Sequence, residues 1–367
     1  MAAPKSTHWA LEPHTSAKHA ILRRYLDAWI PILNFANYRE VLYIDAFAGP
    51  GSYSGGEDGS PIIALKALAA HQPALSAIYH FHFVEEKADR AAALQVAVDR
   101  QLLSMGNPQN LRVVVHCSSF EAAYPKIKLL FPNQKLPPTF AFIDPFGWTG
   151  LPFDIVREIL SFQSCEVMIN FMFEEINRFL ANPDQNSNFD QLFGGLNWRK
   201  CAEISDPKAR NKCLHDLYGS RLSSAASFVR SFEMRNFKNS TDYYLFFATR
   251  SIDGLKKMKA SMWKVDEGGA FTFSDATDTR QSVLFEQEPQ FDLLRRQIVQ
   301  KFAGKTVSVD QIERFVISET AFRETHFKVQ ILKVLKATVP PGLVVTTAKP
   351  GRKRGQFPSG TVVRFAP

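Results

Sequence analysis

Cysteine is scarce in this chain, with 4 residues in 367. No two of them have the C-x-x-C spacing of a zinc site, and their number is far below that of a disulfide scaffold, so the sequence excludes both classes. Because reduced thiols are the rule in cytoplasmic proteins, we expect every cysteine to be reduced and partly buried. The four positions are Cys117, Cys165, Cys201 and Cys213.

Long apolar runs are missing as well. No segment reaches the roughly 20 apolar residues that a helix needs to cross a bilayer, and residues 1–9 lack the apolar core of a signal peptide. These absences exclude a membrane-spanning protein, and they predict a cytoplasmic protein with no membrane partner. At 367 residues the chain is longer than one typical domain, so two domains are expected.

Excess charge is absent from most of the chain. The formal net charge is +8, yet residues 289–367 alone hold 14 Lys and Arg against 5 Asp and Glu. The whole positive excess therefore lies in the last segment. A basic segment joined to a neutral body is typical of proteins that bind a polyanion, so we predict a nucleic-acid partner, DNA or RNA.

Five short apolar runs have the length of buried strands, at 41–47, 78–84, 111–116, 139–143 and 165–172. Segments with helical spacing separate most of them, and this alternation predicts βαβ units and a parallel sheet. A polar helical stretch at about 182–235 precedes two further strands, 243–249 and 271–273. We therefore predict an α/β fold over residues 1–285, with a Rossmann-like sheet and a helical insertion.

Residues 286–367 have a different pattern. Three helical segments precede two β-rich runs, and the loop between those runs is strongly basic. Three helices followed by a hairpin are typical of a winged helix, so we predict a small C-terminal winged-helix domain that binds nucleic acid. Its phosphate contacts are expected to be mostly independent of base sequence. The basic residues of the loop are Lys349, Arg352, Lys353 and Arg354.

A glycine-rich loop follows the first strand, in residues 43–53 (YIDAFAGPGSY). Gly49 and Gly51 allow the backbone to approach a ligand closely at the carboxyl edge of a parallel sheet. No lysine follows the second glycine, which excludes a P-loop. The ammonium and sulfonium of S-adenosylmethionine suit the carboxylate of Asp45, whereas the pyrophosphate of a dinucleotide does not. We therefore predict an S-adenosylmethionine site that includes Phe47, with a nicotinamide oxidoreductase as a weaker alternative.

The ends of the next two strands supply further candidates for the cofactor site. Glu85 follows the second strand, where an acidic side chain can accept hydrogen bonds from both ribose hydroxyls. Ser118 and Ser119 follow the third strand, where they would frame the adenine. Serine is also common in any turn after a strand, so a purely local role for this pair stays open.

The fourth strand ends in residues 142–148 (FIDPFGW). Methyltransferases that act on amino groups of nucleic-acid bases have Asp or Asn, two prolines and an aromatic residue here. Asp144 and Pro145 match that pattern, Phe146 replaces the second proline, and Gly147 takes the aromatic position. We predict that Asp144, Pro145 and Phe146 orient and stack on the acceptor base. The alternative is an Asp-Pro turn that only caps the next helix.

Histidines give no metal site in this sequence. His80 and His82 lie on one face of a strand, but no third ligand is nearby, so we interpret them as core residues and predict no metal.

Together the motifs resemble the three-Cys-motif partner protein family over most of residues 9–275. The resemblance includes segments 14–29, 44–51, 59–61, 144–147, 169–178 and 244–249. It implies a bacterial or phage protein with a Rossmann-like methyltransferase fold, and a partner protein that carries the three cysteines and is similar to radical S-adenosylmethionine enzymes. A looser similarity to ribosomal-RNA adenine-N6 methyltransferases implies that Lys18 and His19 lie beside the cofactor.

We therefore expect an S-adenosylmethionine-dependent methyltransferase acting on a base amino group of RNA or DNA. Since a base inside a duplex is out of reach, the target must be single-stranded or flipped out. An alternative of another class is a non-catalytic subunit that binds the cofactor and recognises nucleic acid for the three-Cys partner.

Overall fold

The computed structural model describes residues 6–71, 75–266, 271–274, 290–347 and 356–367. The chain divides into two compact units. The first comprises Met1–Gly254 and Thr272–Asp278, and the second comprises Leu255–Phe271 and Thr279–Pro367. Among the described residues, no helix is long and apolar enough to cross a membrane.

The first unit is built on a sheet with the order β3-β2-β1-β4-β5-β7-β6-β8 in the described residues. Strands β1 to β5 are parallel, whereas β7 runs antiparallel to both of its neighbours, β5 and β6. The bounds are β1 (Glu40–Asp45), β2 (Ile78–Glu85), β3 (Leu111–Cys117), β4 (Thr139–Ile143), β5 (Cys165–Phe171), β6 (Phe228–Arg235), β7 (Thr241–Thr249) and β8 (Thr272–Ser274).

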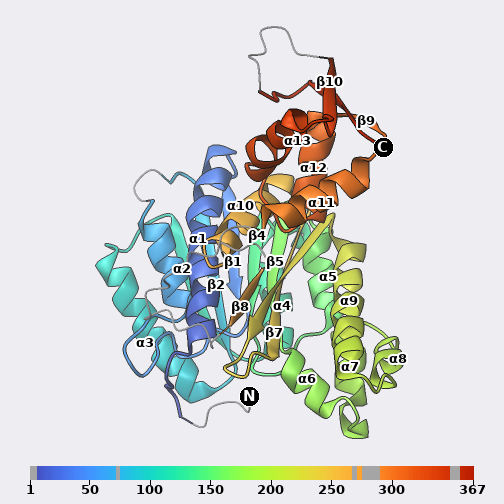
Figure 1. Cartoon of the computed structure of the whole chain (residues 1–367). Coiled ribbons are helices and arrows are strands. Elements are labelled where there is room, and N and C mark those ends of the chain that lie inside the picture. The colour runs from blue at the N-terminus through green and yellow to red at the C-terminus, as the bar shows by residue number, and fades with distance from the viewer. Residues whose placement is uncertain (1–5, 72–74, 267–270, 275–289, 348–355) are drawn as a thin grey trace. The chain divides into compact units, whose positions relative to one another are not determined.

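Helices cover both faces of this sheet (Figure 1). On one face, α1 places Tyr25 and Trp29 against Phe140 of β4. On the other face, α5 and α9 join a core that contains Ile143 and Val167. The helices of the unit are α1 (Pro13–Phe35), α2 (Ser60–Ala69), α3 (Ala88–Ser104), α4 (Phe120–Leu129), α5 (Phe153–Ser161), α6 (Phe173–Phe179), α7 (Asn186–Leu192), α8 (Trp198–Ala202) and α9 (Pro207–Ala225).

This layered arrangement confirms the predicted α/β fold class. The central strands are buried on both sides, which explains why β4 (TFAFI) and β5 (CEVMINF) are nearly continuous apolar runs. The strand order reverses between β1 and β4, and in Rossmann-like sheets ligands bind at the carboxyl ends of the strands beside that point. The antiparallel β7 lies between β5 and β6 in this sheet.

The helical insertion is shorter than predicted. Helices α7, α8 and α9 lie within the predicted 182–235, but α9 ends at Ala225 and β6 occupies Phe228–Arg235. Extending the helical insertion to residue 235 was therefore wrong. In β6, Phe232 and Met234 are buried and their neighbours are less so, which is the period of two that a strand requires.

The prediction that all cysteines are reduced was also wrong. Cys201 of α8 and Cys213 of α9 form a disulfide, with their Cα atoms 5.5 Å apart. The pairing arises because the two helices pack side by side, and the sequence spacing of 12 residues does not reveal that packing. Cys117 and Cys165 are free.

The second unit combines helices with a small antiparallel sheet of order β10-β11-β9 in the described residues. The winged-helix assignment of this unit stays a prediction. The predicted basic residues of the hairpin, Lys349, Arg352, Lys353 and Arg354, lie outside the described residues. The elements are α10 (Ile252–Trp263, which begins in the first unit), α11 (Phe291–Phe302), β9 (Thr306–Ser308), α12 (Val309–Glu319), the π-helical turn Lys328–Leu332 that runs into α13 (Lys333–Ala337), β10 (Leu343–Thr347) and β11 (Val362–Phe365).

Candidate functional site

The loop after β1 makes a tight turn that requires glycine. Gly51 has φ +83°, and a Cβ there would lie 3.0 Å from Leu94 Cδ1 and 3.1 Å from Ala97 Cβ of α3. An L side chain would therefore meet both backbone strain and a close contact. The sequence and the packing against α3 fix the path of the loop along the carboxyl edge of the sheet.

Glu85, at the end of β2, holds this loop in place. Its Oε2 accepts a hydrogen bond from the backbone N–H of Gly49 at 3.0 Å, and its Oε1 accepts one from the N–H of Lys87 at 2.8 Å. The side chain is 7% exposed. Each carboxylate oxygen can accept more than one hydrogen bond, so Glu85 keeps the capacity to accept ribose hydroxyls.

Asp45, at the end of β1, is completely buried, and it is not among the residues that line the cavity described below. The Ser60 hydroxyl and the backbone N–H of Phe47 are donors beside this carboxyl, but neither makes a hydrogen bond of ordinary geometry with it. Burial raises the pKa of this carboxyl to about 7, and the neighbouring Ser60 hydroxyl opposes the rise. A buried carboxylate without a partner is costly, so its charged form requires a nearby cation.

The other predicted cofactor residues have varied surroundings. The Oγ of Ser119 accepts a hydrogen bond from the Ala122 N–H and caps α4. This is the local role that the sequence analysis left open for this serine. Phe47 packs against Phe120, with ring centroids 6.3 Å apart. Ser118 donates its backbone N–H to the carbonyl of Glu85 at 3.2 Å. These three residues therefore lie around the ends of β1, β2 and β3, where we predicted them.

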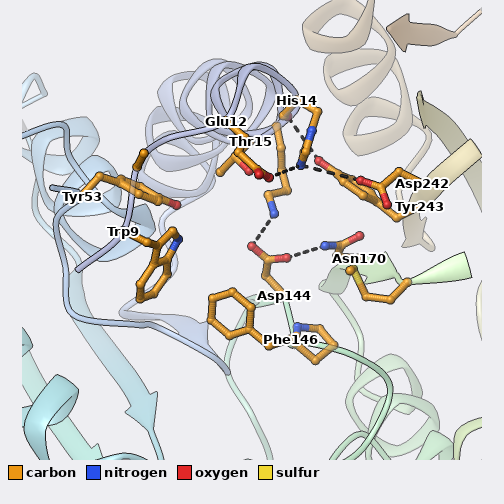
Figure 2. A pocket seen from close by; sticks show the side chains of 14 residues that line it. Trp9, Glu12, His14, Thr15, Tyr53, Asp144, Phe146, Asn170, Asp242 and Tyr243 are labelled. Carbon is orange, nitrogen blue, oxygen red and sulfur yellow. Dashed lines mark hydrogen bonds and ion pairs between the residues drawn. The ribbon is translucent and has the colours of Figure 1, made fainter. Parts of the chain in front are cut away.

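A cavity of about 290 Å³ opens beside the glycine loop within the first unit (Figure 2). Its walls come from the segment before α1, from α1 itself, from the loop after β4, and from the facing ends of β5 and β7. Trp9 joins the two features, because its ring lines the cavity and lies 3.5 Å from where a Cβ on Gly49 would be. Other side chains that line the cavity are Lys18, Tyr53, Asp144, Phe146, Asn170 and Tyr243.

Asp144 is held from two sides at the floor of the cavity. The Nζ of Lys18 lies 2.5 Å from its Oδ2, and the Nδ2 of Asn170 donates to its Oδ1 at 2.6 Å. Figure 2 shows the Asp144 and Asn170 side chains pointing toward each other. Two donors directed at one carboxylate fix its orientation.

Lys18 is 4% exposed and lies with its Nζ 5.3 Å from the centroid of the Tyr243 ring. The neighbouring His19 is 7% exposed, and its ring lies 5.7 Å from the ring of Tyr53. Burial, followed by the charge of Lys18, lowers the pKa of His19 to about 3, so this imidazole is neutral. The predicted pair thus divides, with Lys18 in an ion pair with Asp144 and His19 packed beside it.

Aromatic side chains form one wall of the cavity. Trp9 and Phe146 meet edge to face with ring centroids 5.1 Å apart, and the guanidinium of Arg90 lies 4.8 Å from the Trp9 ring. Phe146 is 40% exposed. A flat, partly exposed aromatic face beside a carboxylate suits a planar ligand that also donates hydrogen bonds.

An acidic cluster on another wall was missed by the sequence analysis. His14 Nε2 lies 3.1 Å from Glu12 Oε2 and 3.8 Å from Asp242 Oδ2. Burial and then the Glu174 carboxylate raise the pKa of Asp242 to about 6. Asp242 is near the start of β7, and that end reaches the cavity because β7 runs antiparallel to β5. Only the strand direction, which a single sequence does not show, would have placed it here.

The arrangement of possible metal ligands, by residue type and distance, gives no metal site in the described part of the chain. Among the described residues, no group of three or more His, Cys, Asp or Glu is arranged to hold a metal ion. His82, 1% exposed, instead pairs its Nδ1 with His116 Nε2 at 2.9 Å inside the sheet.

Comparisons with known proteins give distant similarities only. No family model matches the chain, and no curated protein matches it. An O-methyltransferase from Bacillus cereus, in complex with S-adenosylhomocysteine, is 12% identical with a TM-score of 0.36, over 65% of this chain and 82% of that one. Trm1 from Pyrococcus horikoshii with S-adenosyl-L-methionine is 10% identical with a TM-score of 0.35, over 99% and 93%. At these values the similarities carry no argument about chemistry.

Proposed function

We propose that the chain is an S-adenosylmethionine-dependent methyltransferase that acts on an exocyclic amino group of a nucleic-acid base. The observation that carries this proposal is Asp144, a carboxylate fixed by Lys18 and Asn170 at the floor of a cavity beside the glycine loop.

The residues around β1 and β2 fit the cofactor. Glu85 is fixed by two backbone N–H groups and has lone pairs to spare for the ribose. Asp45 is a fully buried carboxyl whose pKa is raised to about 7, so a ligand cation beside it would stabilise its charged form. Gly51 has no room for a side chain, so the backbone passes close to the sheet edge. When bound, S-adenosylmethionine supplies an electrophilic methyl group on a positively charged sulfur. Nothing in this set suits a pyrophosphate, which argues against a dinucleotide.

The cavity residues fit an amine acceptor. Asp144 accepts a hydrogen bond from the amine and orients its lone pair, and Phe146 offers a face on which a base stacks. The Asp144 carboxylate is placed to accept the proton that the amine would give up on methylation, and the bound cofactor would leave as S-adenosylhomocysteine. Such access requires a flipped-out or single-stranded base.

The remaining parts of the proposal concern partners. The excess of Lys and Arg in residues 289–367 supports phosphate binding by the second unit. The family resemblance supports a three-Cys partner similar to radical S-adenosylmethionine enzymes, working together with this chain in the cytoplasm of a bacterium. The non-catalytic alternative assigns the same cofactor and nucleic-acid contacts to a recognition subunit.

The test combines cofactor binding with methyl transfer. Calorimetric titration should show saturable binding of S-adenosylmethionine and S-adenosylhomocysteine, none of NAD, and a loss of about tenfold or more in Glu85→Gln. Glu86→Gln is the matched control, because Glu86 is exposed and should bind normally. Labelled methyl transfer to single-stranded RNA and DNA should fall about 100-fold or more in Asp144→Ala.

The outcomes separate the alternatives. Cofactor binding without transfer by the wild type, with or without its partner, would leave the recognition-subunit function. Failure of the folded protein to bind either adenosyl ligand would overturn the cofactor assignment itself. Asp154→Ala, an exposed aspartate paired with Arg157 on α5, serves as the matched control for Asp144.

A further inference from the structure

Asn170, near the end of β5, has a side chain whose orientation is fixed. Its Nδ2 donates to Asp144 Oδ1 at 2.6 Å, and Asp144 is ion-paired with Lys18. An ionised carboxylate only accepts hydrogen bonds, so the amide nitrogen must face Asp144. The amide oxygen of Asn170 therefore points elsewhere.

That oxygen has no partner. Asn170 is 4% exposed, and its Oδ1 is buried without a hydrogen bond from any described residue. Buried polar groups are nearly always paired, because leaving one unpaired costs free energy that the rest of the fold must supply. Since Asn170 lines the cavity, the missing donor is expected from a bound molecule.

The two acceptors at the cavity floor lie side by side. Asp144 and Asn170 are joined through a single hydrogen bond, so the carboxylate and the free amide oxygen are separated by little more than one amide group. A primary amine carries two N–H donors, whereas a hydroxyl carries one and a ring carbon none. Two adjacent acceptors therefore match an –NH₂ group better than either alternative.

We propose that Asn170 is a specificity-determining residue, whose amide oxygen and Asp144 each accept one N–H of a primary amino group on the acceptor base. This inference rests on the proposed function and adds to it the residue that accepts the second N–H of the amino group. The remaining walls agree, since Glu12 and Asp242 add further acceptors.

A purely structural role for Asn170 is a poorer explanation. If the residue only oriented Asp144, its oxygen would be expected to find a donor within the protein, as Asn177 does. The Oδ1 of Asn177 accepts a hydrogen bond from Arg210 Nε at 2.7 Å, and Asn177 does not line the cavity. The contrast makes Asn177→Ala a matched control for Asn170→Ala.

The experiment uses pairs of bases that differ only by the amine. Single-stranded oligonucleotides are prepared in which one adenine is replaced by purine, one cytosine by pyrimidin-2-one, or one guanine by hypoxanthine. Binding to the full chain is measured by fluorescence anisotropy in saturating S-adenosylhomocysteine. Because phosphate contacts are the same in both members of a pair, any difference in affinity reports the amine.

We expect the wild type to prefer the amine in at least one pair by about tenfold, the size of one or two buried hydrogen bonds. In Asn170→Ala, the ratio of the two affinities should fall to threefold or less, because one of the two acceptors is gone. The affinity for S-adenosylhomocysteine should be unchanged. Asn177→Ala should keep the full preference. A structural effect on folding would weaken both members of a pair equally, so it would leave the ratio unchanged.

Two results would overturn the proposal. One is equal binding of both members of all three pairs by the wild type, which needs no variant and therefore holds even if Asn170→Ala fails to fold. The other is an undiminished preference in folded Asn170→Ala. If the preference exists, depends on Asn170, and is accompanied by no methyl transfer, the amine site stands and the methyltransferase function fails.

Discussion

Lys18 in the first unit and Lys259 in the second are both buried, with 4% and 1% of their surfaces exposed. The ammonium of Lys259 on α10 donates to the backbone carbonyls of Val316 and Ile317 at 2.8 and 2.9 Å, and to that of Thr320 at 3.0 Å. A lysine has three N–H donors, so each donor of Lys259 has a protein acceptor at the end of α12.

Lys18 has a different environment. Among the described residues its only hydrogen-bond acceptor is Asp144, and its Nζ faces the cavity and the Tyr243 ring. The number of protein acceptors therefore distinguishes a buried lysine that stabilises the fold from one that lies in a candidate ligand site. A fully paired ammonium stabilises a helix end, whereas one with spare donors beside a cavity keeps its neighbours ready for a ligand.

The largest effect expected from this comparison is on stability. Lys259→Met removes the donor from three buried carbonyls and should lower the free energy of unfolding by about 3 kcal/mol. Urea denaturation followed by circular dichroism measures the change. Lys18→Met is the matched variant and should lose about 1 kcal/mol or less, because Asp144 keeps Asn170 and can be solvated through the cavity. Equal losses in the two variants would contradict the distinction.

A second, smaller effect concerns Asp45, the buried carboxyl at the end of β1 beside the glycine loop. Because its folded-state pKa is raised to about 7, the folded protein holds a proton that the unfolded chain releases near pH 4. The free energy of unfolding should therefore fall as pH rises, by about 2 kcal/mol between pH 5 and 7.

Urea titrations at several pH values, without cofactor, measure this dependence. Asp45→Asn should remove it, whereas Asp154→Asn, an exposed control, should not. S-adenosylhomocysteine, which carries an ammonium group, should flatten the wild-type dependence if Asp45 pairs with that charge. An unchanged slope in Asp45→Asn would show that another group is responsible.

The sequence was sufficient for features that are set by local pattern. Strand β4 was predicted at 139–143 and lies at Thr139–Ile143, because a short apolar run buried on both faces has a distinct signature. Asp144 follows directly from that strand end. The glycine loop could likewise be predicted from the sequence. The positive φ of Gly51 and its contact with α3 require a glycine, and a glycine at this point is visible in the sequence.

Features that depend on contacts between segments distant in the chain could not be predicted from the sequence. The Cys201–Cys213 disulfide requires the packing of α8 on α9, and β6 is a strand because it pairs with β7. The role of Asp242 in the cavity depends on the direction of β7. Asn170 lies in the segment 169–178 of the family resemblance, but only the contact with Asp144 shows that its oxygen is left without a donor.

The smallest predicted effect tests whether Lys18 acts through Asp144 or directly on the cofactor. If it acts through Asp144, Lys18→Met should slow methyl transfer about tenfold with S-adenosylhomocysteine affinity nearly unchanged. The double variant with Asp144→Asn should then be no slower than Asp144→Asn alone, because residues that act as one unit are not additive. Lys128→Met, which breaks the Lys128–Glu158 ion pair between α4 and α5, should leave transfer unchanged in either background. Additive losses, together with weaker cofactor binding in Lys18→Met, would instead place Lys18 on the cofactor, and the ion pair seen here would then have to open when the cofactor binds.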